Sequence, residues 1–219
     1  MRAPFILKVC CALVIVSLNH NVLADENSNW YVGASIGKSI NSIDDGGIAE
    51  GLNNGGITTG GGLATSSITD NNSSTGGKIY VGYRLCNLLS LEGGYFDLGS
   101  LGFNAVTAPV GSLNGTLKDQ GGNLDLVGTY LFDERSTLIA RAGITYNQAK
   151  SDFSSSGAVQ LLRSSYSENS TDYKIGVGLN YRISAAFSAR LEAERYRLDD
   201  ATNHQEYVSL LSIGVVYHY

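Results

Sequence analysis

The sequence predicts an all-β fold, in particular an eight-stranded antiparallel up-and-down transmembrane β-barrel, from three observations. The 219 residues include 27 Gly and 13 Tyr but only two Pro. Gly disfavours a helix by about 1 kcal/mol relative to Ala, whereas Tyr suits a pleated sheet. Apolar and polar residues alternate with period two in short segments, which is typical of strands. Short and long joins alternate between these segments, as in a meander of hairpins.

The N-terminal segment is predicted to be a signal peptide outside the barrel. Two basic residues precede an apolar run over 9–18, and a polar stretch then leads to the small residue Ala24. The run is shorter than the roughly 18 apolar residues that a spanning helix needs. We expect residues 1–24 to be a signal peptide, cleaved after Ala24, and residues 25–219 to form one barrel domain. A core helix is the alternative, but nothing helical follows for it to pack against.

Charge and cysteine content exclude several classes of function. The whole chain carries 15 basic and 20 acidic residues, a net charge of −5. Loss of residues 1–24 removes two basic residues and no acidic one, which leaves 13 basic residues and a net charge of −7. This balance disfavours nucleic acid and anionic lipid surfaces as electrostatic partners. Cys86 is the one cysteine that remains, so a disulfide framework and a cysteine-based zinc site are excluded.

The first four strand segments each combine an apolar face with a face of small, polar and charged residues. Segment 30–37 sets Trp, Val, Ala and Ile against Tyr, Gly and Ser. Segment 78–85 sets Ile, Val, Tyr and Leu against Lys, Tyr, Gly and Arg, and segment 89–95 sets Leu, Gly and Tyr against Ser, Glu and Gly. Segment 124–130 sets Leu, Gly and Tyr against Asp, Val and Thr. Alternation places the two sets on opposite faces of each strand.

The last four segments repeat the pattern. Segment 138–146 sets Leu, Ala, Ile and Tyr against Arg, Gly and Thr, and segment 173–182 sets Tyr, Ile, Val and Leu against Lys, Gly, Asn and Arg. Segment 187–194 sets Phe, Ala and Leu against Ser, Arg and Glu. Segment 211–219 sets Leu, Ile, Val and Tyr against Ser, Gly, Val and His. The same division of faces therefore holds from the first strand to the last.

The connections between the strands predict tight turns at one end of the barrel and long loops at the other. The second and third, fourth and fifth, and sixth and seventh strands are joined by a few residues, near 86–87, 133–136 and 184–185. The remaining joins are mostly long and rich in Gly, Ser, Thr and Asn: roughly 41–77, 100–122 and 150–171, with a short last join at 199–204. This regular alternation is typical of outer-membrane barrels.

The charged residues indicate which face lines the interior. A soluble barrel turns its apolar face inward, whereas a membrane barrel turns it toward lipid. The small-residue face carries nine charges: Lys78, Arg84, Glu92, Asp125, Arg141, Lys174, Arg190, Glu192 and Glu194. A soluble calyx for small ligands is the alternative, but its interior should be apolar. We interpret the charged face as the lumen.

Aromatic residues predict the edges of the membrane. One band beside the short turns consists of Trp30, Tyr83, Tyr130, Tyr181 and Tyr217. Tyr95, Tyr146, Tyr173 and Tyr207 mark the opposite edge. About ten residues separate the two bands, and at about 3.3 Å per residue and a tilt of about 40° they cover roughly 25 Å, the height of the apolar band of such barrels.

Five stretches resemble the membrane domain of the OmpA family: 29–34, 91–95, 139–143, 189–192 and 211–219. The resemblance covers the eight strands but not the long loops. It implies a Gram-negative outer membrane, multiple membrane-spanning strands and periplasmic termini. Two-domain relatives continue into a peptidoglycan-binding module, and this chain stops at Tyr219, so we expect no such module.

The lumen is predicted to hold an ionic network. An eight-stranded interior is only just wide enough for side chains, and a buried charge is tolerated when it is paired. We expect the network to consist of Arg84, Glu92, Arg141, Arg190 and Glu192. In the resembled family, inward residues at the positions of Glu92 and Arg190 form a gate, but the acid on its sixth strand is Asn180 here and its inward Lys on strand four has no equivalent. We predict a plug, with simple neutralisation of the interior as the alternative.

Motif-like strings do not lead us to assign catalytic, metal-binding or cofactor-binding residues. Residues 33–37 match G-x-S-x-G, but that elbow needs a strand, a turn and a helix. Residues 37–39 resemble a phosphate loop whose first Gly stands one residue too close. Asp199, Asp200 and His204 could meet in the last loop and activate water, which leaves a surface enzyme as the third functional alternative.

The C-terminus predicts how the barrel reaches its membrane. Val215, Tyr217 and Tyr219 alternate up to an aromatic terminal residue, and this resembles the signal that the barrel assembly machinery recognises. Lipid contact alone is the other interpretation of these three residues.

The predicted function is structural and surface-exposed. We expect an integral outer-membrane barrel with a plugged interior, no cofactor and no nucleic acid partner. Its partners would be outer-membrane lipid, the barrel assembly machinery and, through the loops, host or cell-surface ligands. A narrow low-conductance porin for small solutes is the alternative, and conductance separates the two.

Overall fold

The computed structural model describes residues 29–41, 64–71, 73–108, 111–157, 165–199 and 205–219. Nine strands lie within these ranges: β1 (Trp30–Asn41), β2 (Ala64–Asn71), β3 (Ser73–Cys86), β4 (Leu89–Ala108), β5 (Gly111–Leu131), β6 (Ser136–Gly157), β7 (Ser165–Arg182), β8 (Phe187–Asp199) and β9 (Gln205–His218). Within the same ranges, no helix is long and apolar enough to cross a membrane. The predicted signal peptide, residues 1–24, lies outside the described residues.

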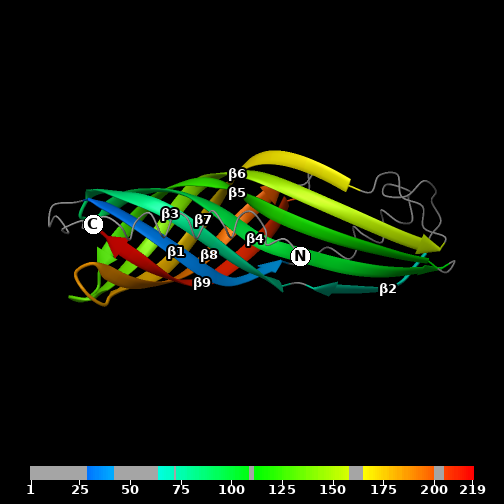
Figure 1. Cartoon of the computed structure of the whole chain (residues 1–219), viewed down its shortest axis with the longest axis horizontal. Coiled ribbons are helices and arrows are strands. Elements are labelled where there is room, and N and C mark those ends of the chain that lie inside the picture. The colour runs from blue at the N-terminus through cyan, green and yellow to red at the C-terminus, as the bar shows by residue number, and fades with distance from the viewer. Residues whose placement is uncertain (1–28, 42–63, 72, 109–110, 158–164, 200–204) are drawn as a thin grey trace, which may run out of the picture.

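Eight of these strands close a barrel, which confirms the predicted fold class (Figure 1). Antiparallel pairing runs around the ring in the order β1, β3, β4, β5, β6, β7, β8, β9. The ring closes where β9 returns to β1, with Val32 opposite Tyr217 and Ile36 opposite Ile213. Strand β2 stands outside the ring and pairs with the far end of β4. Closure pairs each barrel strand on both sides, which removes the free edge of an open sheet.

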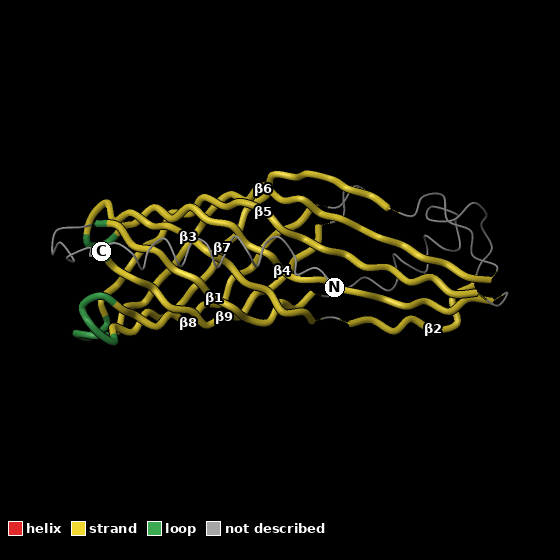
Figure 2. Tube along the Cα trace, viewed as in Figure 1, coloured by secondary structure: helices red, strands yellow, loops and turns green. Residues whose placement is uncertain are grey.

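The tight turns gather at one end of the barrel, as predicted (Figure 2). They join β3 to β4, β5 to β6 and β7 to β8. In the second of these turns, the Asp133 carboxylate accepts the backbone N–H groups of Arg135 and Ser136, each at 2.7 Å. Strand β1 begins and β9 ends at the same place, where Tyr31 pairs with His218. We call this the inner end of the barrel and the opposite one the outer end.

The outer end differs from the prediction of long loops. Strands continue through most of 100–122 and 150–171, and they pair beyond the barrel up to Thr107 opposite Gly111 and Asp152 opposite Ser165. Ser, Gly, Thr and Asn give these stretches weak hydrophobic alternation, which hid the strands. Pairing continues because strands that leave the barrel are already aligned, so each further residue adds ladder hydrogen bonds. We call β2 and the parts of β4 to β7 at 98–108, 111–119, 149–157 and 165–169 the outer sheet.

A β-bulge marks the point where β4 enters the outer sheet. The register between β4 and β5 shifts between Asp97 and Ser100. Gly99 has φ 80°, and its N–H donates to the Asp97 carboxylate at 2.8 Å. Gly adopts positive φ without the strain that a Cβ would bring. A bulge bends and twists its strand, so this one directs β4 out of the barrel wall.

Side chains of the barrel wall alternate between lipid and lumen as predicted. Large apolar side chains point outward and are exposed, among them Ile36, Val81, Leu126, Ile144, Val177, Leu191 and Ile213. Eight charged side chains of the same wall point inward and are buried, whereas Lys38 and Arg195, toward the outer end, are exposed on the outward face. This arrangement is the inverse of a soluble barrel.

Candidate functional site

Eight charged side chains meet inside the barrel, from the six consecutive strands β3 to β8. Each is at most 6% exposed. We call this set the lumen ionic layer: Lys78, Glu92, Asp125, Arg141, Lys174, Arg190, Glu192 and Glu194. Four are cations and four are anions, so the formal charge of the layer is zero. Neutrality matters because a buried charge without a partner is strongly destabilising.

Arg141 on β6 lies at the centre of the layer. Its Nη1 is 3.0 Å from Glu92, 2.9 Å from Asp125 and 3.6 Å from Glu194, and its Nη2 pairs with Glu192. The planar guanidinium offers several donors in fixed directions, so one side chain can hold carboxylates from three different strands.

Two lysines complete the outer part of the layer. The Lys78 ammonium lies 2.6 Å from Glu192 and 2.8 Å from Glu194. The Lys174 ammonium lies 2.9 Å from Asp125 and 2.9 Å from Glu194. Charge-assisted bonds of this length are stronger than neutral ones. Each lysine therefore links two carboxylates, which joins the ion pairs into one network.

Arg190 and Glu92 form the inner part of the layer. Arg190 Nη1 donates to Glu92 Oε1 at 2.7 Å, and the Tyr31 hydroxyl donates to the same oxygen at 2.8 Å. The guanidinium also lies over two aromatic rings, with its carbon 5.1 Å from the centroid of Tyr80 and 5.7 Å from that of Tyr31. Such cation–π contacts add to the ion pair.

Two glycines make room for these aromatic side chains. A Cβ at Gly33 would overlap the Tyr80 ring, and a Cβ at Gly82 would overlap the Tyr31 ring. Gly is required here because the rings lie directly across the backbone of the neighbouring strand. The small residues that the sequence places on the lumen face thus alternate with large ones that fill it.

Apolar clusters lie on both sides of the lumen ionic layer. Toward the outer end, Phe96, Leu98, Tyr196, Val208 and Leu210 form a buried cluster. Toward the inner end, Tyr31, Tyr80 and Val216 form another. Every side chain in the two clusters is at most 5% exposed. The lumen ionic layer thus lies between two buried apolar clusters.

The structure brings together four of the five network residues expected from the sequence. Glu92, Arg141, Arg190 and Glu192 are in contact. Arg84 is not part of the layer: it has the inward parity, but it stands two residues before the end of β3 and is exposed at the inner mouth.

Four members of the layer were missing from the expected network: Lys78, Asp125, Lys174 and Glu194. The alternation of the sequence places all four on the inward face. Their inward positions, combined with the requirement that buried charges sum to zero, would have predicted them as members of the layer.

The aromatic bands and the C-terminal residues lie on the outward side of the wall. At the inner end, Trp30, Tyr130 and Tyr181 are exposed, and Trp30 contacts Tyr83 edge-on at 4.9 Å between ring centroids. The rings of Tyr217 and Tyr219 are 5.1 Å apart, and Val215 is exposed beside them. Toward the outer end, Tyr95, Tyr146, Tyr173 and Tyr207 are exposed.

One buried acid, Asp119, lies outside the membrane-spanning part of the barrel. In β5 that part begins at Gly122, which pairs with both Tyr95 and Tyr146 of the outer aromatic band. Asp119 lies farther out and is 5% exposed. Burial, followed by repulsion from Asp172, raises the pKa of Asp119 to about 7.

The remaining motif-like residues do not form a reactive arrangement in the described part of the chain. The Ser of 33–37 lies in the middle of β1, which continues as a strand to Asn41. Asp200 and His204 lie outside the described residues, and Asp199 ends β8. Within the described ranges, no group of three or more His, Cys, Asp or Glu side chains is placed to hold a metal ion.

Comparison with known proteins is consistent with this architecture. The OmpA-like transmembrane domain matches residues 25–219. Neisserial surface protein A is 15% identical, with 88% of this chain and 98% of that chain covered and a TM-score of 0.51. OprG from Pseudomonas aeruginosa is 11% identical, with 88% and 97% covered and a TM-score of 0.51.

The protease OmpT from Escherichia coli is 11% identical, with 90% of this chain and 98% of that chain covered and a TM-score of 0.51. At these identities the three structures share the fold with this chain. No curated protein sequence matches it.

Proposed function

Because the chain belongs to the family of OmpA-like transmembrane domains and is an integral barrel of the Gram-negative outer membrane, we propose that it is a closed structural barrel that presents its outer sheet at the cell surface. The inner end then faces the periplasm. The observation that carries the closed interior is the lumen ionic layer, whose charges are buried and sum to zero between two apolar clusters.

The outer sheet supports the surface role. Strand β5 begins about 11 residues before the outer aromatic band, which corresponds to roughly 25 to 30 Å of projection beyond the membrane. On one face Leu101, Ala105 and Leu113 are buried, whereas Asn114 and Ser154 are exposed on the other. A paired sheet with one polar face holds that face in a defined shape, which a flexible loop does not. We propose that this face contacts ligands on other cells.

Planar-bilayer recording tests the closed interior against the narrow porin. The wild type should show no steady ionic current, because ions would have to cross the apolar clusters and the paired charges. Phe96→Ala and Tyr196→Ala together should open the outer cluster, whose two rings lie 4.9 Å apart, and produce measurable current. Steady current of large amplitude from the wild type would replace the plug with a pore.

Adherence to cultured epithelial monolayers tests the surface role. Bacteria that display the wild type should adhere more than bacteria that display a variant in which residues 100–118 are replaced by a two-residue turn. The variant keeps the pairing of Asp97 with Gln120, so the barrel should still insert. Equal adherence at equal surface display would remove the adhesive role and leave the structural one.

A further inference from the structure

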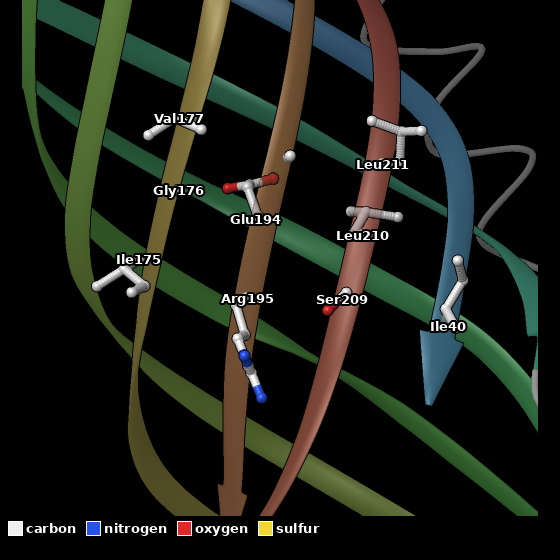
Figure 3. Close-up of a pocket in the computed structure, with 10 residues that line it drawn as sticks. Ile40, Ile175, Gly176, Val177, Glu194, Arg195, Ser209, Leu210 and Leu211 are labelled. Carbon is white, nitrogen blue, oxygen red and sulfur yellow. The ribbon is translucent and has the colours of Figure 1, made fainter. Parts of the chain in front are cut away.

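A shallow apolar depression lies on the lipid-facing surface of the barrel (Figure 3). It has a volume of about 330 Å³ and extends over β7, β8 and β9 to the end of β1. Its walls are exposed large side chains, Ile40, Ile175, Val177 and Leu211. These four side chains lie on the side of the wall opposite the lumen, and Glu194 of the lumen ionic layer and the buried Leu210 also border the depression.

The register explains why the wall is hollow there. Ala193 of β8 stands between Val177 of β7 and Leu211 of β9. Ser209 of β9 stands one step farther out, between β8 and Ile40 of β1. Two small side chains thus form a floor between four large ones. Such a floor and walls fit a flexible hydrocarbon chain, which gains burial of its apolar surface.

Arg195 lines the depression at its outer end, and Arg197 lies two residues farther along β8. Arg195 is exposed, and its side chain extends along β8 toward the C-terminal arrowhead of that strand (Figure 3). Its guanidinium carbon lies 4.4 Å from the centroid of the Tyr207 ring, and that of Arg197 lies 5.2 Å from the centroid of Tyr173. Both tyrosines belong to the outer aromatic band, so these cations lie at the level of lipid headgroups.

Lys38 supplies a third cation on the opposite side of the depression. It is exposed on the outward face of β1 and pairs with Leu211 in the register. Its long side chain can carry the ammonium outward to the headgroup level. Strand β9 alone separates β1 from β8, and Arg195 lies two residues along β8 from Ala193, which is in line with Lys38, so roughly 12 Å separates the backbones of Lys38 and Arg195.

The three cations are a local exception to the charge of the chain. The net charge of −5 disfavours attraction to an anionic surface in general. On β8, however, Glu192 and Glu194 point inward and are buried, while Arg195 points outward. Strand β8 therefore has its acids in the lumen and Arg195 on the lipid-facing side. This places a positive charge beside the apolar depression.

We propose that this depression binds lipid A, the phosphorylated and multiply acylated lipid of the outer leaflet. An acyl chain lies between Ile175, Val177 and Leu211, and phosphate groups contact Arg195 and Lys38. Guanidinium and ammonium groups both bind phosphate, and the guanidinium does so with paired donors. Two separated cations match a headgroup with two phosphates better than a phospholipid with one.

Native mass spectrometry of the chain, purified in detergent, tests the proposal with four lipids: diphosphoryl lipid A, monophosphoryl lipid A, phosphatidylglycerol and phosphatidylcholine. Diphosphoryl lipid A should bind at least tenfold more tightly than phosphatidylglycerol, and monophosphoryl lipid A should be intermediate. Arg195→Gln and Lys38→Gln should each weaken lipid A binding about tenfold, the loss that 1.4 kcal/mol produces. Arg135→Gln, the same change in an exposed turn at the inner end, should have no effect.

A second pair of variants separates the depression from the charges. Ala193→Leu fills the floor and keeps the cations, so it should weaken lipid A binding several-fold. Ala189→Leu makes the same change on the outward face of β8 nearer the inner end and should leave binding unchanged. Equal affinity for all four lipids, or lipid A affinity that survives Arg195→Gln, would overturn the proposal, and preference for phosphatidylglycerol would reassign the site to phospholipid.

Discussion

The Glu92 carboxylate is held by Arg190, Arg141 and Tyr31 at 2.7 to 3.0 Å. Glu92→Ala removes one negative charge and leaves the lumen ionic layer with a net charge of +1. In a dry interior such a defect costs about 3 to 5 kcal/mol. Glu92→Ala combined with Arg190→Ala restores neutrality and should recover much of the loss. A double-mutant cycle on urea unfolding in lipid vesicles measures this coupling.

An exposed pair provides the control for that cycle. Lys118 and Asp97 lie 3.5 Å apart and are both more than 30% exposed, so their coupling should be below about 1 kcal/mol. Additive losses for Glu92 and Arg190 would mean that the two side chains do not act on each other in the folded barrel.

Asp119 should make the stability of the barrel depend on pH. Its pKa is raised from its ordinary value of 3.8 to about 7, by burial first and by repulsion from Asp172 second. An acid with a raised folded-state pKa binds its proton more tightly when folded, so the free energy of unfolding should fall as pH rises from about 4 to about 7. Each pH unit in that window corresponds to at most about 1.4 kcal/mol. Unfolding by urea at pH 5 and pH 8 measures the difference.

Asp119→Asn should remove this dependence, because the amide stays neutral at both pH values. The variant should therefore be more stable than the wild type at pH 8. Asp152→Asn, which changes an exposed acid of the outer sheet, should behave like the wild type. If the wild type is equally stable at pH 5 and pH 8, the burial of a charged Asp119 carries no cost.

Single residues of the lumen were predictable where alternation was clear. Glu92, Arg141, Arg190 and Glu192 followed from inward parity alone, and they meet in the structure. Arg84 shares the inward parity but lies at the exposed inner mouth, because parity gives the face of a strand and not the depth along it. Which carboxylate each cation contacts depends on the shear of the closed ring, and no local pattern in the sequence specifies that shear.

Among the strands, those that cross the membrane were predicted and those beyond it were not. Between the two aromatic bands, the barrel wall has lipid on its outer side and charged residues on its inner side, so apolar and polar residues must alternate along each strand. In the outer sheet this contrast between the two faces is lost: residues 150–157 consist mainly of Ser, with Gly, Lys, Asp and Phe, and Ser154 to Gly157 are exposed on both faces of β6. The bulge at Gly99 also shifts the parity of β4. Backbone hydrogen bonding alone extends these strands, and it leaves no periodic pattern of apolar and polar residues in the sequence.

Strand β8 offers the sharpest test of the lipid-facing surface. Leu191 is half-exposed, stands midway between Phe187 and Arg195, and pairs with Leu179 and Ile213. Leu191→Arg should therefore cost about 2 to 4 kcal/mol, as expected for a cation at the bilayer midplane. Unfolding in lipid vesicles measures the loss.

The matched control for Leu191→Arg lies in the outer sheet. Ser154 is exposed on β6 beyond the membrane, and Ser154→Arg should change stability by less than about 0.5 kcal/mol. Equal costs at the two positions would contradict the assignment of the outward face to lipid.

The molecule as a whole is a closed sheet without free strand edges, built around a lumen ionic layer whose formal charge is zero. The seam between β1 and β9 is as fully paired as the joints between strands that are neighbours in the chain, from Tyr31 opposite His218 to Asn41 opposite Val208. Opening the barrel anywhere exposes two strand edges to lipid at once, where unpaired backbone groups have no water to bind. Unfolding should therefore be cooperative and slow.

Gel mobility before and after boiling tests this closure. The folded chain in detergent should migrate faster unboiled than boiled, because a closed barrel resists the detergent that unfolds an open sheet. Ile213→Pro removes a ladder N–H at a position paired with both Ile36 and Leu191, so the fast-migrating form should be lost or should convert at lower temperature. Ser154→Pro should leave it intact, since β6 beyond Asp152 pairs only with β5 in the described strands. Identical mobility with and without boiling would contradict a closed barrel, and equal sensitivity to the two prolines would mean that the seam does not limit unfolding.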